Sequence, residues 1–226
     1  MSPRPFALVV LVGWIAVLGM TTSCSLQAKV TFTPNGEARV QSVLGLQSAA
    51  RGAWKSLRDL DASLPEDPLA PALWTKGLGP GAQVTAVPGG IQASFLVAQP
   101  SKFLPQLTLK DDQWDLTVDR TTLRALANLS AWAGSPALDS LLPAPGTKVT
   151  ETDYRDLLTY LLGPSLSEVA AQAAIDGSTV ELTVEAPRPI LGAPGAASVS
   201  GTRATFRWPL VKVLVLSSPL KVHLTF

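Results

Sequence analysis

The chain has 226 residues, which is enough for one domain together with an N-terminal targeting segment. Its 18 Lys and Arg residues nearly balance 17 Asp and Glu residues, giving a formal net charge of +1. This balance argues against a nucleic-acid-binding protein, which needs a basic surplus to displace counterions from phosphates, and against an acidic disordered tail.

The first 23 residues have the three parts of an export signal. Arg4 and the amino terminus supply the positive charge, residues 6–20 form an apolar stretch, and residues 21–23 are small. A permanent spanning helix needs about 20 apolar residues, so this stretch is short for one. We predict a signal peptide over residues 1–23 and a single extracytoplasmic domain over residues 24–226. An uncleaved anchor is the alternative.

Cys24 comes directly after this segment and is the only cysteine of the chain. No intramolecular disulfide can therefore form, and a free thiol is a liability in an oxidising compartment. The junction resembles that of bacterial lipoproteins, whose lipobox ends in the cysteine that becomes the acylated first residue. This resemblance predicts lipid attachment at Cys24. The alternative is an unmodified thiol on a soluble periplasmic protein, because Thr21 and Ser23 also suit the ordinary signal peptidase.

The first part of the predicted domain is a hairpin followed by a helix. Residues 26–34 alternate between apolar and polar side chains, and Asn35-Gly36 is a strong turn signal before a return strand at about 37–46. Residues 48–60 then change to a helical period with an apolar stripe that includes Trp54.

Three basic side chains of this helix, Arg51, Lys55 and Arg58, share the face opposite the stripe. Together with Trp54 they are candidates to lie against anionic lipid headgroups. The alternative is the solvated face of an ordinary amphipathic surface helix.

The rest of the chain predicts strands, then helices, then strands again. Residues 61–81 are rich in Pro and Gly, with at most one helical turn around "PALW". The later strands are expected at 82–87, 91–98, 114–119, 178–186, within 197–208 and at 219–226. Helices are expected at 121–134, 150–162 and 165–177, the last beginning with a Ser165/Glu168 capping box. This order predicts an α+β fold in which antiparallel hairpins form a curved sheet packed with three to four helices.

Catalytic motifs are missing from the sequence. His223 is the only histidine, and it shares an alternate face of the last strand with Lys221 and Thr225, so we expect it to be exposed. Asp111, Asp112, Asp115 and Asp119 fit a turn and the polar face of a strand better than a calcium loop. The G-x-S-x-G, Walker and H-E-x-x-H motifs are absent. We therefore expect no metal, no cofactor and no enzyme activity.

Two segments carry a wider resemblance: "CSLQAKVTFTPNGEARV" at residues 24–40 and "PLVKVLVLSSPLKVHLTF" at residues 209–226. They are similar to bacterial envelope lipoproteins of the LppM type. The resemblance implies a membrane-tethered α+β domain that handles lipid or glycolipid.

These observations lead to one functional hypothesis and two alternatives. The hypothesis is a lipid-anchored envelope protein, facing the periplasm or the cell exterior, whose domain binds a lipid or another apolar ligand between sheet and helices. The first alternative is a scaffold that interacts with envelope proteins through its surface. The second is an envelope hydrolase that uses a carboxylate pair.

Overall fold

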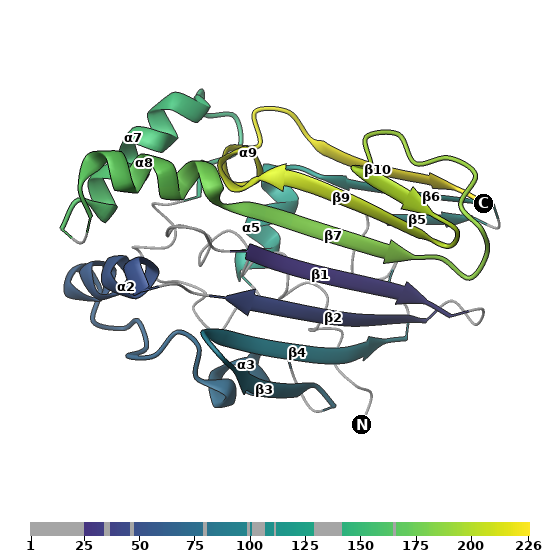
Figure 1. Cartoon of the computed structure of the whole chain (residues 1–226), viewed down its shortest axis with the longest axis horizontal. Helices are drawn as coiled ribbons and strands as arrows, with labels where there is room; N and C mark the ends of the chain where they lie inside the picture. The colour runs from purple at the N-terminus through teal and green to yellow at the C-terminus, as the bar shows by residue number, and fades with distance from the viewer. Residues whose placement is uncertain are drawn as a thin grey trace.

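The structure is a computed structural model that describes residues 25–33, 37–45, 48–78, 81–98, 100, 107–110, 112–128, 142–164 and 166–226. The α+β prediction is confirmed: the described strands form one seven-stranded and one three-stranded sheet, with helices around them (Figure 1). The predicted Asn35-Gly36 turn, Cys24 and residues 1–23 lie outside the described residues.

The larger sheet has the strand order β3-β4-β2-β1-β7-β9-β8. Its strands are β1 (Ser25–Phe32), β2 (Ala38–Gly45), β3 (Gln83–Val87), β4 (Gly90–Val97), β7 (Thr179–Glu185), β8 (Ser198–Ser200) and β9 (Arg203–Pro209). All neighbours are antiparallel except β1 and β7, which are parallel. The predicted antiparallel hairpins are present, whereas the parallel β1–β7 pair was not predicted, because a pairing between strands so distant in sequence leaves no turn signal.

Alternation of side chains explains why one face of this sheet is buried. Along β2, Val40 and Leu44 are buried while Arg39, Gln41 and Val43 are exposed. The buried face of the sheet forms the core, and the other face meets solvent, as is common for antiparallel sheets.

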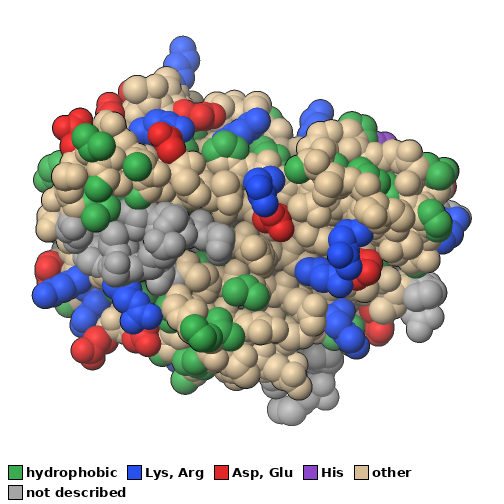
Figure 2. Space-filling view, in the orientation of Figure 1, with side chains coloured by type: hydrophobic (Ala, Val, Ile, Leu, Met, Phe, Trp, Pro, Cys, Tyr) green, Lys and Arg blue, Asp and Glu red, His purple; other side chains and the backbone are tan. Residues whose placement is uncertain are grey.

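The solvent-facing side is largely polar and carries cross-strand ion pairs (Figure 2). Lys29 on β1 lies 2.6 Å from Glu185 on β7, and Arg207 on β9 lies 2.6 Å from Glu181 on β7. The pKa of Glu185 is lowered, first by its hydrogen bond with Lys29. On the outer face, the first pair links the two parallel strands to each other, and the second links β7 to β9.

The smaller sheet covers part of the core and has the order β10-β6-β5. Its strands are β5 (Leu107–Lys110), β6 (Gln113–Val118) and β10 (Leu220–Thr225), and in Figure 1 it lies behind β7 and β9. An edge-to-face contact between Phe32 of β1 and Trp114 of β6 joins the two sheets. The predicted strands at 114–119 and 219–226 are confirmed, whereas β5 was not predicted.

The described helices depart from the predictions at three places. They are α2 (Ser48–Leu60), α3 (Pro71–Leu78), α5 (Arg120–Asn128), α7 (Glu151–Leu162), α8 (Glu168–Gly177) and α9 (Leu210–Val215). Helix α3 has two turns rather than one, and the buried helix α9 was not expected at all. The N-cap of α8 is Ser167, whose hydroxyl accepts from the Ala170 amide, rather than the predicted Ser165.

The two ends of the larger sheet carry different connections. Residue pairing places Ser25 beside Thr179 and Leu26 beside Leu44. Helix α8, which precedes β7, and helix α2, which follows β2, are therefore connected to the sheet at the end where β1 begins. Helix α9 comes after β9 at the same end. We call this end, with α2, α7, α8 and α9, the helical end. The opposite end, formed by residues 186–197 and the β8–β9 turn, is the loop end.

Candidate membrane-facing end of the domain

The start of β1 fixes where a tether on Cys24 would meet the domain. β1 begins at Ser25 and is bonded on both sides, to β2 and to β7, so the chain enters the middle of the sheet. Cys24 itself lies outside the described residues, and its acylation stays a prediction. Because no residue separates Cys24 from β1, an anchor on that sulfur would hold the helical end of the domain close to the membrane.

Helix α2 forms with the bounds that its periodicity predicted, and its apolar stripe faces the core. Trp54 is only 4% exposed, and its indole Nε1 donates a hydrogen bond to the Pro65 carbonyl oxygen at 2.8 Å. Leu57 is buried beside it. Trp54 therefore does not belong to the predicted membrane-facing set: a buried indole cannot lie among lipid headgroups, and this part of the prediction was wrong.

The basic row of α2 divides into two kinds of side chain. Arg51 and Lys55 are exposed, whereas Arg58 is half-buried and donates from Nε to the Leu64 carbonyl oxygen at 3.2 Å. Asp59 is exposed on the same helix. The two cations that remain fully available to a charged surface are therefore Arg51 and Lys55.

Helices α7 and α8 pack against each other next to α2. A capping box starts α7: the Thr150 hydroxyl accepts from the Asp153 amide, and the Asp153 carboxylate accepts from the Thr150 amide at 3.0 Å. The Thr150 hydroxyl also donates to that carboxylate at 2.7 Å, and together these bonds hold the pKa of Asp153 below its usual range. An ion pair between Arg155 and Asp176 links the two helices.

The inner face of these helices is apolar and tightly buried. Tyr154, Leu158 and Leu162 of α7 and Ala171 and Ile175 of α8 are the buried side chains. Burial raises the pKa of the Tyr154 hydroxyl far above its usual range, so it stays neutral. The helix pair is thus held to the domain by side-chain packing.

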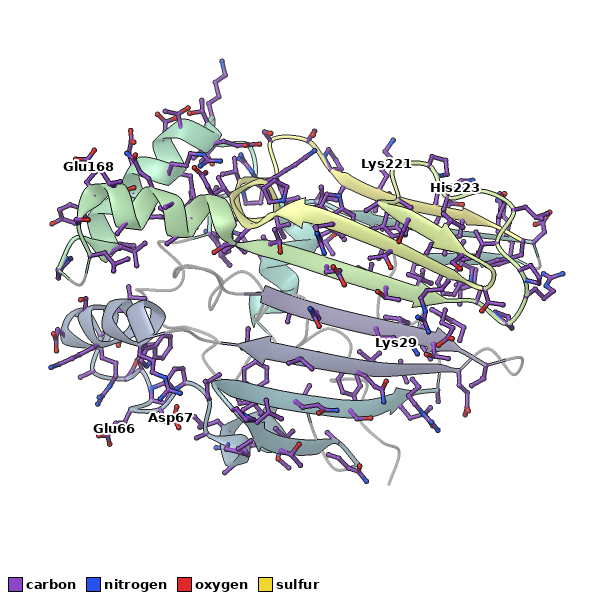
Figure 3. All side chains as sticks on the ribbon, viewed as in Figure 1. Lys29, Glu66, Asp67, Glu168, Lys221 and His223 are labelled. Carbon is purple, nitrogen blue, oxygen red and sulfur yellow. The ribbon has the colours of Figure 1, made fainter. Side chains whose placement is uncertain are left out.

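The outer face of the same helices exposes large apolar side chains. Tyr160 is 80% exposed, Val169 is 78% exposed, and Leu157 is also exposed. We call Leu157, Tyr160 and Val169 the apolar tip. The prediction of helices at 150–162 and 165–177 did not identify them, because the apolar residues of one helix do not show which of them its neighbours cover. Asp156 and Glu168 are exposed beside them, and Figure 3 shows Glu168 at the end of α8 that lies away from the sheet.

The only histidine lies elsewhere, on the smaller sheet. His223 of β10 pairs in register with Asp115 of β6, and their Nδ1 and Oδ1 atoms are 2.6 Å apart. The ring is half-buried rather than fully exposed. Asp119, also from the acidic cluster, accepts from the Thr122 amide at 2.7 Å, and this bond is the main reason that its pKa is lowered. Asp115 thus belongs to a cross-strand pair and Asp119 to a helix start, while Asp111 lies outside the described residues, which contain no group of three potential metal ligands.

Comparisons with known proteins show a distant structural similarity. No protein-family model matches the chain, and no curated protein matches it. The structure is similar to the solution structure of the folded domain of LppM from Mycobacterium tuberculosis, with 10% sequence identity over 91% of each chain and a TM-score of 0.40. This is a distant structural similarity. Within the described part of the chain, the helices are too short or too polar to cross a membrane.

Proposed function

We propose that this protein is exported and held on a cell-envelope membrane through acylation of Cys24, and that its domain binds lipid or another apolar ligand rather than catalysing a reaction. The observation that supports the proposal most is the position of the sole cysteine. It stands between an apolar N-terminal segment with signal character and the first residue of the central strand β1.

The placement of the helices supports the lipid-binding part of the proposal. An anchor at Cys24 brings the helical end to the membrane, and that end carries the apolar tip and two exposed cations, Arg51 and Lys55. Acyl chains supply about 0.8 kcal/mol per buried methylene, so two or three chains make such anchoring stable. The ligand class we propose is therefore membrane lipid.

The anchor is tested by labelling with a radioactive or alkyne-tagged fatty acid. We expect the label in the wild-type protein and its loss in Cys24→Ser, because the sulfur is the proposed attachment atom. A Ser25→Ala variant, which keeps the sulfur, serves as a matched control and should be labelled like the wild type. Equal label in the wild type and in Cys24→Ser would overturn the proposal.

The ligand is tested separately by extracting the purified protein with organic solvent. Lipid identified by mass spectrometry, at a constant ratio to protein and beyond the covalently attached chains, would support binding. An extract that contains no lipid besides the anchor would contradict it.

A scaffold is the second candidate, and the outer face of the larger sheet favours it. Val43 on β2 and Leu96 on β4 are exposed there among polar side chains, and Leu96 lies in register with Arg39. Such mixed surfaces occur at protein interfaces. Site-specific crosslinking from Leu96 in cells tests this candidate: one reproducible protein adduct would favour it, and the absence of adducts would argue against it.

A further inference from the structure

We propose that the apolar tip of α7 and α8 inserts into the interface of the lipid bilayer, while Arg51 and Lys55 of α2 face anionic headgroups. The orientation in this inference rests on the proposed anchor at Cys24. It adds a specific membrane-contact surface that the anchor alone does not require.

Helices α2, α7 and α8 lie at the end of the sheet where the proposed anchor would be. Helix α8 has 10 residues and is therefore about 15 Å long. It ends at Gly177, next to Thr179, which pairs with Ser25 at the start of β1. In Figure 1, α2, α7 and α8 lie beyond the end of the sheet at which β1 begins. An anchor immediately before Ser25 therefore cannot bring the sheet to the membrane without bringing these helices there first.

The side chains of the apolar tip suit the membrane interface. Tyr160 and Val169 are among the most exposed large hydrophobic side chains of the described residues, and they lie on two helices joined by the short connection 163–167. Large exposed apolar side chains at one end of a domain indicate a contact surface. Tyrosine is also characteristic of the membrane interface, where its ring is apolar and its hydroxyl stays hydrated.

The positive charges of α2 favour anionic lipid headgroups. Arg51 and Lys55 are exposed on α2, which packs against α7. Each basic side chain close to an anionic membrane contributes about 1 kcal/mol of attraction. Asp156 and Glu168, next to the apolar tip, oppose this attraction. We therefore expect the apolar tip to supply most of the affinity and α2 to supply a moderate preference for anionic lipid.

The loop end offers a matched comparison. Leu191 is 80% exposed, as much as Tyr160, and Val199 is 47% exposed, but both lie at the end of the sheet opposite the start of β1. If exposure alone decided membrane contact, both ends would touch lipid. If the anchor decides it, only the apolar tip will.

The single cysteine of the chain makes a direct experiment possible. Once Cys24 is acylated, a cysteine introduced elsewhere is the only free thiol and can carry a polarity-sensitive fluorophore. The full-length protein in cell membranes would be labelled as Tyr160→Cys or Val169→Cys, with Leu191→Cys and Val199→Cys as controls. We expect blue-shifted emission, quenched by lipid-attached quenchers, at positions 160 and 169 only.

Two results would overturn the inference. The first is water-like emission at positions 160 and 169. The second is a blue shift there that lipid-attached quenchers do not reduce, since the apolar tip would then contact protein instead of lipid.

A vesicle experiment separates failure of this inference from failure of the anchor. Full-length Cys24→Ser protein is mixed with phosphatidylcholine vesicles with or without phosphatidylglycerol. Adding Tyr160→Ser and Val169→Ser should weaken sedimentation with vesicles at least about tenfold, since each change removes buried apolar area. Leu191→Ser with Val199→Ser should change nothing, and Arg51→Ala with Lys55→Ala should remove the preference for phosphatidylglycerol.

The outcomes are then distinct. Fatty-acid label at Cys24 without vesicle binding by the Cys24→Ser protein, and without a blue shift at position 160, leaves the anchor and refutes the contact surface. Vesicle binding that depends on the apolar tip, in a protein that takes up no fatty acid, supports the contact surface and refutes the anchor.

Discussion

The helical end and the loop end of the larger sheet both expose large apolar side chains, yet different forces hold them. At the loop end, the amide of Leu191 donates to the Thr225 carbonyl oxygen at 2.8 Å, and the amide of Thr225 donates to the Gly192 carbonyl oxygen at 2.9 Å. The Arg188 guanidinium also lies over the Phe226 ring. Backbone hydrogen bonds thus fasten this segment to β10.

The helical end is fastened mainly by side-chain packing. Helix α7 contacts α2, α8 and α9, and its contribution to the core consists of Tyr154, Leu158 and Leu162. Tyr160 and Leu191 are equally exposed, but side-chain packing holds the helix of Tyr160 in place and backbone hydrogen bonds hold the segment of Leu191. Removing buried carbons should affect the helical end most, whereas the loop end should tolerate changes that leave its backbone hydrogen bonds in place.

Truncation of one buried leucine in α7 should have the largest effect. Leu158 is 1% exposed and its neighbour Leu157 is 36% exposed. We expect Leu158→Ala to lower the free energy of unfolding by about 2–5 kcal/mol, since it removes transfer energy and leaves a cavity. Leu157→Ala, the matched control, should cost less than about 1 kcal/mol. Urea denaturation measures both, and equal losses would show that α7 does not hold the helical end through its buried face.

Two glycines, one at each end of the sheet, differ in how closely the surrounding atoms approach them. A Cβ on Gly90, at the helical end, would collide with the main-chain oxygen of Leu44. A Cβ on Gly192, at the loop end, would lie 2.7 Å from Thr225 Oγ1, a hydroxyl that can rotate away. We expect Gly90→Ala to cost about 1–3 kcal/mol and Gly192→Ala less than about 1 kcal/mol, because backbone cannot move as a hydroxyl can. A larger loss for Gly192→Ala in thermal or urea unfolding would reverse this assignment.

The start of α7 gives a smaller effect. Thr150→Ala removes the side-chain half of the capping box and should cost about 1 kcal/mol of unfolding free energy. Thr152 is exposed in the first turn of the same helix, and Thr152→Ala should change the stability by less than about 0.5 kcal/mol. Circular dichroism during urea unfolding measures both variants. Equal stability of Thr150→Ala and wild type would mean that the cap does not stabilise the helix.

Local patterns were sufficient to predict much of the fold. The period of residues 48–60 gave the bounds of α2, and strict alternation identified β1, β2, β4 and β7. Helix α9 was missed because "LVKVLV" is a short, nearly continuous apolar run, which periodicity cannot assign to helix or strand. The parallel β1–β7 pair and the separation of β10 into the smaller sheet depend on long-range packing, which leaves no local signal.

The candidate site was only partly predictable for a related reason. The spacing of Arg51 and Lys55 correctly placed them on an exposed face of α2. The same spacing placed Trp54 on the apolar stripe, but it could not show that its indole reaches the Pro65 carbonyl oxygen. The exposure of Leu157 was not predictable, because the periodicity of one helix does not show which of its residues the neighbouring helices cover. The apolar tip depends on how α7 and α8 pack, which the sequence of either helix alone does not show.

The smallest predicted effect concerns acid and the same helix cap. Asp153 has a lowered pKa in the folded protein, caused first by the Thr150 side chain and then by the Thr150 amide. An Asp in an unfolded chain has a pKa of about 3.9, so the folded state binds fewer protons near that pH. The stabilisation by this carboxylate is therefore present above about pH 4 and is lost as the pH falls through the lowered folded pKa.

Thr150→Ala removes the larger cause of the lowered pKa and keeps the amide bond, so the difference in stability between wild type and Thr150→Ala should narrow as the pH is lowered from 6 to about 2. Thr152→Ala, which does not touch Asp153 in the capping box, should show a gap that is constant with pH. Urea unfolding at several pH values measures both gaps, and a Thr150→Ala gap that stays constant or widens in acid would show that the Asp153 carboxylate does not stabilise the start of α7.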